Sequence, residues 1–119
     1  MAISFFKSIA PTMYPAECYR ESYRQQWRIP EYEPIILTSA EDSYWYARDV
    51  IKGRWPEAES IILTSSVDSY YYARDVIKER WPEAESAIMT CEWSRGEYYE
   101  CFEHQFTNEE QSLWLLTIL

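Results

Sequence analysis

The sequence predicts an all-α protein, a short solenoid-like array of helix-turn-helix units with a 26-residue repeat. Residues 35–60 read IILTSAEDSYWYARDVIKGRWPEAES, and residues 61–86 read IILTSSVDSYYYARDVIKERWPEAES. A period of this length is typical of repeat proteins, in which each unit is one supersecondary element. Within the period, prolines stand where helices can begin, and apolar residues recur at helical spacings. No segment shows the sustained alternation of apolar and polar residues that a β-strand would.

The same register continues beyond the two central copies. The four residues that start at Arg28, Arg54 and Arg80 read RIPE, RWPE and RWPE. We therefore expect a single domain, with atypical end units because terminal repeats must face solvent. Residues 1–119 would divide into an N-terminal cap (1–29), three repeat units (30–55, 56–81 and 82–107) and a C-terminal capping helix (108–119).

Each unit is expected to contain a short helix followed by a longer one. In the second unit Pro56 suits the first helical position, where a missing N–H costs nothing, and the short helix should end near Thr64. Ser65 or Ser66 can cap the longer helix, because a serine hydroxyl accepts a hydrogen bond from the backbone at a helix start. This helix should run to about Glu79, since the residue before a proline is disfavoured in helices.

The longer helix of that unit carries the expected core. Its core-facing stripe would comprise Tyr70, Ala73, Ile77 and Trp81, with Tyr72 and Val76 beside it. The spacing of the stripe places its side chains on one face of an α-helix. We therefore expect that face to be buried.

The N-terminal part departs from the repeat. Pro34 replaces the serine found at positions 60 and 86, and a proline inside a helix removes a hydrogen bond. The first short helix should therefore begin late, near Pro34. Upstream, a helix is expected from Pro15 to Trp27, because Tyr19, Tyr23 and Trp27 follow one another at spacings of four.

The C-terminal part predicts a last helix over residues 108–118. Thr107 and Glu110 have the spacing of a capping box, in which each side chain accepts a hydrogen bond from the other residue's backbone. An apolar run follows, and we expect Leu113, Leu116 and the other large residues within it to close the core.

The charge of the chain restricts its partners. Its net charge is −9, and residues 82–119 contain one basic residue, Arg95, against eight carboxylates. Nucleic acids and anionic membranes both attract Lys and Arg, so we expect no direct nucleic-acid binding and no membrane association. A protein with a basic surface would be attracted instead.

The cysteines and the apolar runs indicate a cytoplasmic protein. Cys18, Cys91 and Cys101 are odd in number and contain no C-x-x-C pair, which favours free thiols over disulfides or a zinc site. The first residues lack the long apolar run of a secretion signal, and no stretch reaches membrane-spanning length.

One segment resembles a known repeat. Residues 46–59 read YARDVIKGRWPEAE, which is similar to the YAxxVIKGRWPEAE-type repeat of uncharacterised proteins from tailed bacteriophages and some bacteria. The resemblance covers residues 35–86 well and the flanks poorly, and it implies no particular chemistry. It implies a phage-encoded accessory protein. By analogy with other small acidic phage proteins, such a protein would inhibit a host defence system, for example as an anti-CRISPR protein, in the host cytoplasm.

Residues able to carry catalysis are sparse. Cys101 and His104 could share a helix face, but nucleophilic catalysis also needs an orienting group and an oxyanion site, and the chain has only two glycines. A metal site built from Glu100, Glu103 and His104 would have suitable atoms without a recognised motif. We therefore expect neither an enzyme nor a bound metal or cofactor.

Two equivalent aromatic residues are the first candidates for recognition. Trp45 and Tyr71 are aromatic in both copies, lie off the expected core stripe, and occupy one of the four positions that differ between the copies. Exposed aromatic residues at one repeat spacing would form a ladder for a partner protein, since aromatic residues are enriched at interface hot spots. Packing between neighbouring units is the competing interpretation.

The second candidate is the acidic C-terminal third. Glu92, Glu97, Glu100 and Glu103 lie at mostly helical spacings and would form either a docking surface for a basic host protein or only a solvated face. The leading hypothesis is a binding protein that inhibits its host partner. Two alternatives stay open: an acidic mimic that blocks a DNA- or RNA-binding groove, and a self-assembling structural protein, since stacked units can also stack across chains.

Overall fold

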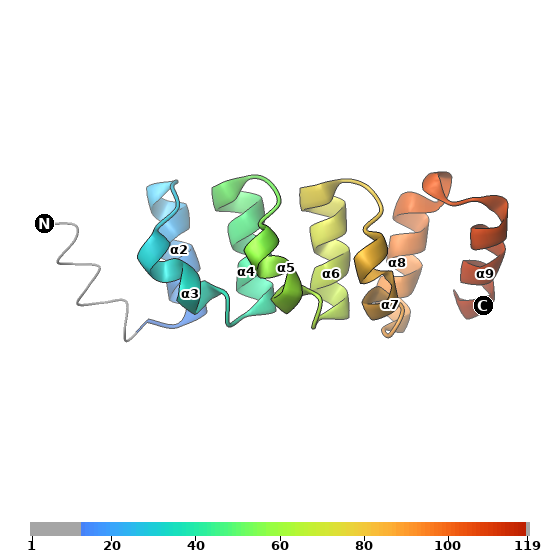
Figure 1. Cartoon of the computed structure of the whole chain (residues 1–119), viewed down its shortest axis with the longest axis horizontal. Helices are drawn as coiled ribbons and strands as arrows, with labels where there is room; N and C mark the ends of the chain where they lie inside the picture. Colours follow the sequence, from blue (N-terminus) through green and yellow to red (C-terminus); the bar gives the residue numbers. More distant parts are fainter. Residues whose placement is uncertain (1–12, 119) are drawn as a thin grey trace, which may run out of the picture. The chain divides into compact units, whose positions relative to one another are not determined.

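The computed structural model describes residues 13–118, and every regular element among them is helical (Figure 1). The predicted all-α class is confirmed. The chain divides into two compact units, unit 1 (Met1–Ile62) and unit 2 (Leu63–Leu119). The stacking of three repeat units between two caps as an array stays a prediction.

Unit 1 is built around α4. Its described elements are α2 (Pro15–Gln25), a 3₁₀ turn (Pro30–Tyr32), α3 (Glu33–Ile36), α4 (Ala40–Tyr46), a π-helical turn (Ala47–Ile51) and α5 (Pro56–Ile62). Both α2 and α5 pack against α4, and α3 packs against α2.

Unit 2 is built around α8. Its described elements are α6 (Ser66–Tyr72), a π-helical turn (Ala73–Ile77), a 3₁₀ turn (Pro82–Ala84), α7 (Glu85–Ile88), α8 (Glu92–Phe102), a second 3₁₀ turn (Glu103–Gln105) and α9 (Asn108–Ile118). Within this unit α8 lies between α6 and α9 (Figure 1).

Serine caps begin the longer helices of both repeats. The Ser65 hydroxyl accepts a hydrogen bond of 3.1 Å from the Asp68 backbone N–H, and Ser39 accepts one of 3.1 Å from Asp42. Of the two serines that the sequence allowed as the cap, Ser65 is therefore the one that caps the helix. The short helix α5 begins at Pro56, as predicted.

The longer helices end earlier and differently than predicted. The sequence indicated an α-helix to about Glu79. Instead, the α-helix is followed by a π-helical turn, whose last hydrogen bond joins the Lys78 N–H to the Ala73 carbonyl at 2.7 Å. Lys52 closes the equivalent turn in unit 1 in the same way, at 2.7 Å. Lys52 and Lys78 then adopt left-handed backbone conformations, with φ of 62° and 66°.

The π turn also corrects the expected core stripe. A five-residue turn rotates the side chains that follow it away from their α-helical positions. Ile77, the last residue of this turn, is half-exposed, whereas Tyr72, which precedes the turn, is fully buried. Tyr70, Ala73 and Trp81 are buried as predicted.

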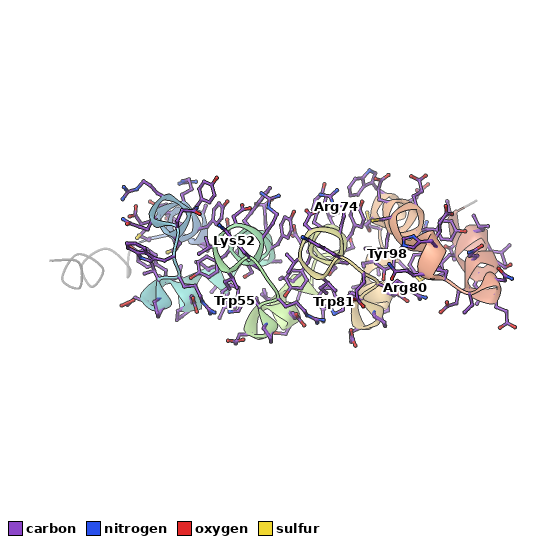
Figure 2. All side chains as sticks on the ribbon, turned by 90° about the horizontal axis from the view of Figure 1, so that it is seen from above. Lys52, Trp55, Arg74, Arg80, Trp81 and Tyr98 are labelled. Atoms are coloured by element: carbon purple, nitrogen blue, oxygen red, sulfur yellow. The ribbon has the colours of Figure 1, made fainter. Side chains whose placement is uncertain are left out.

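The same buried network recurs in each unit. In unit 2 the Tyr98 hydroxyl accepts a hydrogen bond from the Trp81 N–H (2.9 Å) and donates one to Glu85 (2.7 Å), and Arg80 pairs with Glu85 at 2.8 Å (Figure 2). Burial and the Glu85 carboxylate together raise the pKa of Tyr98. The tyrosine thus stays a hydrogen-bond donor at neutral pH and ties α8 to the start of α7.

Unit 1 repeats this network with its own residues. The Tyr46 hydroxyl accepts from the Ile29 N–H (3.1 Å) and donates to Glu33 (2.6 Å), and Arg28 pairs with Glu33 at 2.8 Å. The arginine that begins each of these RIPE and RWPE segments therefore pairs, within the fold, with the glutamate five residues after it. A partly exposed pair of this kind stabilises by roughly 0.2–1 kcal/mol.

The N-terminal helix is shorter than predicted, and the row of aromatic residues that indicated it is not its buried face. It ends at Gln25 rather than Trp27. Tyr23 and Trp27 are exposed, while the small residues Cys18 and Ser22 are fully buried. These small side chains let α2 lie close to α3 and α4. Large aromatic side chains on that face would hold the helices apart.

The first short helix begins at Glu33, close to the predicted start at Pro34. The reason is not the proline alone. Unit 2 shows the same 3₁₀ turn followed by a short α-helix, although Ser86 occupies the position equivalent to Pro34. The split does not occur in every repeat unit, because α5, with Ser60 at this position, is continuous from Pro56 to Ile62.

The predicted last helix is confirmed, but the two leucines that were predicted to close the core are exposed. Thr107 and Glu110 form the capping box, with hydrogen bonds of 2.8 and 3.1 Å. Leu113 and Leu116 are 64% and 75% exposed. A helix packed on one side can bury only one face, and Trp114 occupies that face against Tyr98, with 5.4 Å between the ring centroids.

Candidate functional site

Trp45 lies on α4 and is half-buried rather than free-standing. The Arg48 guanidinium covers its ring at 4.3 Å from the centroid, and the Tyr19 ring lies 6.4 Å away. Arg48 is held in turn by Asp49 at 2.7 Å, and Asp49 also accepts a hydrogen bond of 2.6 Å from the Tyr19 hydroxyl. Most of these contacts therefore fix Trp45 within unit 1.

Tyr71 lies on α6 in a similar setting with a different neighbour. Arg74 covers its ring at 4.8 Å, as Arg48 covers Trp45. Trp93 of α8 approaches edge-on, at 5.9 Å from Tyr71 and 5.7 Å from Tyr70. We call Tyr70, Tyr71 and Trp93 the aromatic cluster of unit 2.

Trp93 is the recognition candidate that sequence reasoning missed. Its side chain is 48% exposed, although it is one of the largest apolar groups in the chain. The signal was present in the sequence, because Trp93 and Glu97 are four residues apart, and so are Glu92, Gly96 and Glu100. These two adjacent rows share one face of a helix. We call them together the solvent face of α8.

The four predicted acidic residues gather at this face. Glu92 and Glu100 are exposed on α8, Glu97 is half-buried there, and Glu103 is exposed in the turn that follows. Along the described part of the chain, none of the four carboxylates forms an ion pair. Arg95 is the basic residue on α8, and it donates to the Met89 carbonyl at 3.0 Å instead.

A groove runs between α8 and α9 beside this face. It has a volume of about 530 Å³ and is lined by Gly96, Tyr99, Glu100, Glu103, Leu115 and Ile118. The carboxylates come from the α8 side and the aliphatic side chains from α9. Gly96 leaves its floor open, because a Cβ added there would meet no atom within 4 Å. We call this the α8–α9 groove.

The residues considered for catalysis are not assembled. Cys101 is half-buried, and burial raises the pKa of its thiol. His104 is exposed, and its ring lies 3.4 Å from the Gln105 amide nitrogen. No interaction joins the thiol to the imidazole between residues 13 and 118, so this pair lacks the base contact that activates a nucleophile.

A metal centre was the other chemical candidate. Across the described residues, no group of three or more His, Cys, Asp or Glu side chains is placed to hold a metal ion. Glu100 and Glu103 line the groove without a third ligand from this set.

No family model, curated protein or solved structure matches the chain. In the described part of the chain, no helix has the length and apolar content needed to cross a bilayer. The geometry of unit 2 is therefore the main evidence on function. It combines an exposed tryptophan, carboxylates that form no ion pair and a groove with both acidic and apolar lining residues, which are the elements of a contact surface.

Proposed function

We propose that this protein acts by binding a partner protein with a basic surface, and that the partner contacts the solvent face of α8. The observation that carries the proposal is the half-exposed Trp93 surrounded by carboxylates that have no ion-pair partner in unit 2. An exposed tryptophan on a rigid helix supplies contact energy, and the surrounding charge selects the partner.

The aromatic cluster supports Trp93 as an anchor. Tyr70 is buried and Tyr71 is half-buried, and both rings touch the indole edge-on. The indole therefore loses little freedom on binding, which lowers the entropic cost of the contact. Tyr71, a residue predicted from the sequence, would act as support and as the margin of the interface.

The biological role is the inhibition of a host protein by occupying its surface. The resemblance of residues 46–59 to a repeat of phage proteins favours this role in an infected cell. Unpaired carboxylates also favour a second candidate, a mimic of nucleic-acid charge that blocks a DNA- or RNA-binding groove. The two candidates differ in what they require, because charge mimicry needs no exposed tryptophan.

The test is affinity purification of host proteins with the full chain, comparing Trp93→Ala with the matched control Trp27→Ala. Trp27 is also exposed but belongs to unit 1 and is not one of the residues of the proposed face. We expect a stoichiometric partner whose affinity falls by about tenfold or more in Trp93→Ala, as at an interface hot spot, and is unchanged in Trp27→Ala.

Salt separates the two candidates. Binding anchored by Trp93 should survive an increase to about 0.5 M NaCl, whereas charge mimicry should be lost as exposed charges are screened. Retention of the partner by Trp93→Ala, or the absence of any stoichiometric partner, would contradict the proposal.

A further inference from the structure

The α8–α9 groove has two chemically different walls. Tyr99 forms part of its floor, and Leu115 and Ile118 form the apolar wall from α9. Tyr99 is held by an edge-on contact with Phe106 at 5.6 Å, so this part of the floor is fixed. Glu100 and Glu103 stand along the other wall, and both are exposed.

Neither carboxylate of the acidic wall forms an ion pair within the described part of unit 2. Arg80 is engaged by Glu85 at 2.8 Å and by Glu110 at 2.9 Å, and it lies over the Phe106 ring. Arg95 donates to a backbone carbonyl. The groove therefore presents negative charge beside apolar surface, and its complement is a surface with both cationic and aliphatic groups.

The size of the groove indicates more than one inserted side chain. A volume of about 530 Å³ is within the range of pockets that enclose whole small molecules. The groove follows two helices, α8 (Glu92–Phe102) and α9 (Asn108–Ile118), each about 16 Å long at 1.5 Å per residue. Side chains presented one helical turn apart could occupy it together, as when an amphipathic helix lies in an apolar groove.

We propose that the α8–α9 groove receives a basic amphipathic helix of the partner protein. The apolar side chains of that helix contact Tyr99, Leu115 and Ile118, and its Lys or Arg side chains pair with Glu100 and Glu103. This inference rests on the proposed function, because it names the segment of the partner that binds beside Trp93.

The probe is a fluorescein-labelled peptide of about 18 residues with leucines one helical turn apart and lysines elsewhere. The control peptide has the same composition in scrambled order. Binding is measured by fluorescence anisotropy with the full chain. We expect the amphipathic peptide to bind at least about tenfold more tightly than the scrambled one, since only it presents an apolar face.

Gly96→Arg is the decisive variant, because it places a long cationic side chain in the open floor of the groove. Replacing a glycine inside a helix does not oppose folding, and circular dichroism verifies that the variant is folded. Ser86→Arg is the matched control, since it adds the same charge at an exposed position on α7. We expect Gly96→Arg to weaken peptide binding about tenfold or more and Ser86→Arg to leave it nearly unchanged.

Leu115→Ser keeps the inference testable if Gly96→Arg fails to fold, because Leu115 lines the groove and is partly exposed. Equal binding of both peptides, or unchanged binding in the groove variants, would overturn the inference. Full competition by spermine would overturn it too, since the groove would then be a site for small cations.

The outcomes distinguish this inference from the proposed function. A partner that depends on Trp93 but binds Gly96→Arg normally would refute the groove and leave the proposed function in place. Peptide binding that depends on Gly96, with no partner that depends on Trp93, would refute the proposed function and leave a groove for basic helices.

Discussion

Lys52 and Lys78 show how single residues hold strained backbone at the ends of the longer helices. Both have positive φ, which is unfavourable for a residue with a Cβ. Gly53 does not relieve this strain, because it follows the left-handed position instead of occupying it. The π turns hold this strained backbone in place, because the N–H groups of Lys52 and Lys78 each donate a short hydrogen bond to an alanine carbonyl at the start of the turn.

Replacing the strained lysine should therefore stabilise the protein. We expect Lys78→Gly to raise the free energy of unfolding by about 0.5–1 kcal/mol, after subtracting the greater entropy of glycine in the unfolded chain. Urea denaturation followed by circular dichroism measures the change. Lys78→Ala removes the same ammonium group without relieving the backbone, so it should give no gain. A gain in both variants would mean that charge, not φ, is responsible.

Glu110 is a residue whose stabilising contribution depends on pH. Its hydrogen bond with Arg80, together with the Thr107 backbone N–H, lowers the pKa of its carboxyl from 4.5 to about 2. A carboxyl with a lowered pKa in the folded state stabilises the fold above its unfolded pKa. Its contribution is present above about pH 4.5 and is lost as the pH falls towards 2.

Glu110→Gln should consequently be less stable than the parent chain at pH 7, with a difference that shrinks below pH 4.5. Urea titrations between pH 7 and pH 3 test this. Glu109→Gln removes a charge from the same first turn of α9 without touching Arg80 or Thr107, and its effect should be smaller. A destabilisation by Glu110→Gln that is independent of pH would refute the assigned role.

At the scale of elements, α9 has one buried face and one face of exposed leucines. Trp114 packs against Tyr98 and Phe106, with 5.4 and 5.2 Å between ring centroids. Leu113 and Leu116 point away from this contact and are exposed. The helix is therefore attached to unit 2 through Trp114, the Arg80–Glu110 ion pair and hydrogen bonds from the Gln111 amide, whereas Leu113 and Leu116 face solvent.

This arrangement predicts that two neighbouring alanine substitutions on α9 differ strongly in their effect on the free energy of unfolding. Trp114→Ala should lower the free energy of unfolding by about 3–5 kcal/mol, because it empties a buried site. Leu116→Ala should change it by no more than about 0.5 kcal/mol, as at an ordinary surface position. Thermal and urea denaturation of both variants provide the measurement. A cost of several kcal/mol for Leu116→Ala would show that the exposed face is covered in solution.

At the scale of the whole molecule, the residues that stabilise the fold differ from the residues that we propose to contact the partner. The Arg–Glu–Tyr networks use the residues that the repeats share, and they hold each unit together. The proposed partner contacts use residues of α8 and α9, where the sequence diverges from the repeat. A divergent end can gain a binding surface without disturbing the hydrogen bonds on which the fold depends.

The sequence by itself determined the all-α class, a serine cap at Ser65 or Ser66, the proline start of α5 and the capped last helix. Each of these depends on local chemistry, since a cap or a proline acts on its own turn. The acidic residues of the site could be predicted for the same reason, because helical spacing alone brings their positions onto one face.

Only the tertiary structure decided which aromatic residues are buried and where the longer helices end. Trp114 is buried and Leu113 is exposed because both belong to one helix that packs on one side, and the sequence alone does not say which of these two large residues faces the core. The π turns depend on which carbonyl each lysine N–H reaches. The exposure of Trp93 and the α8–α9 groove depend on how α6 and α9 pack against α8, which no spacing within a single helix can specify.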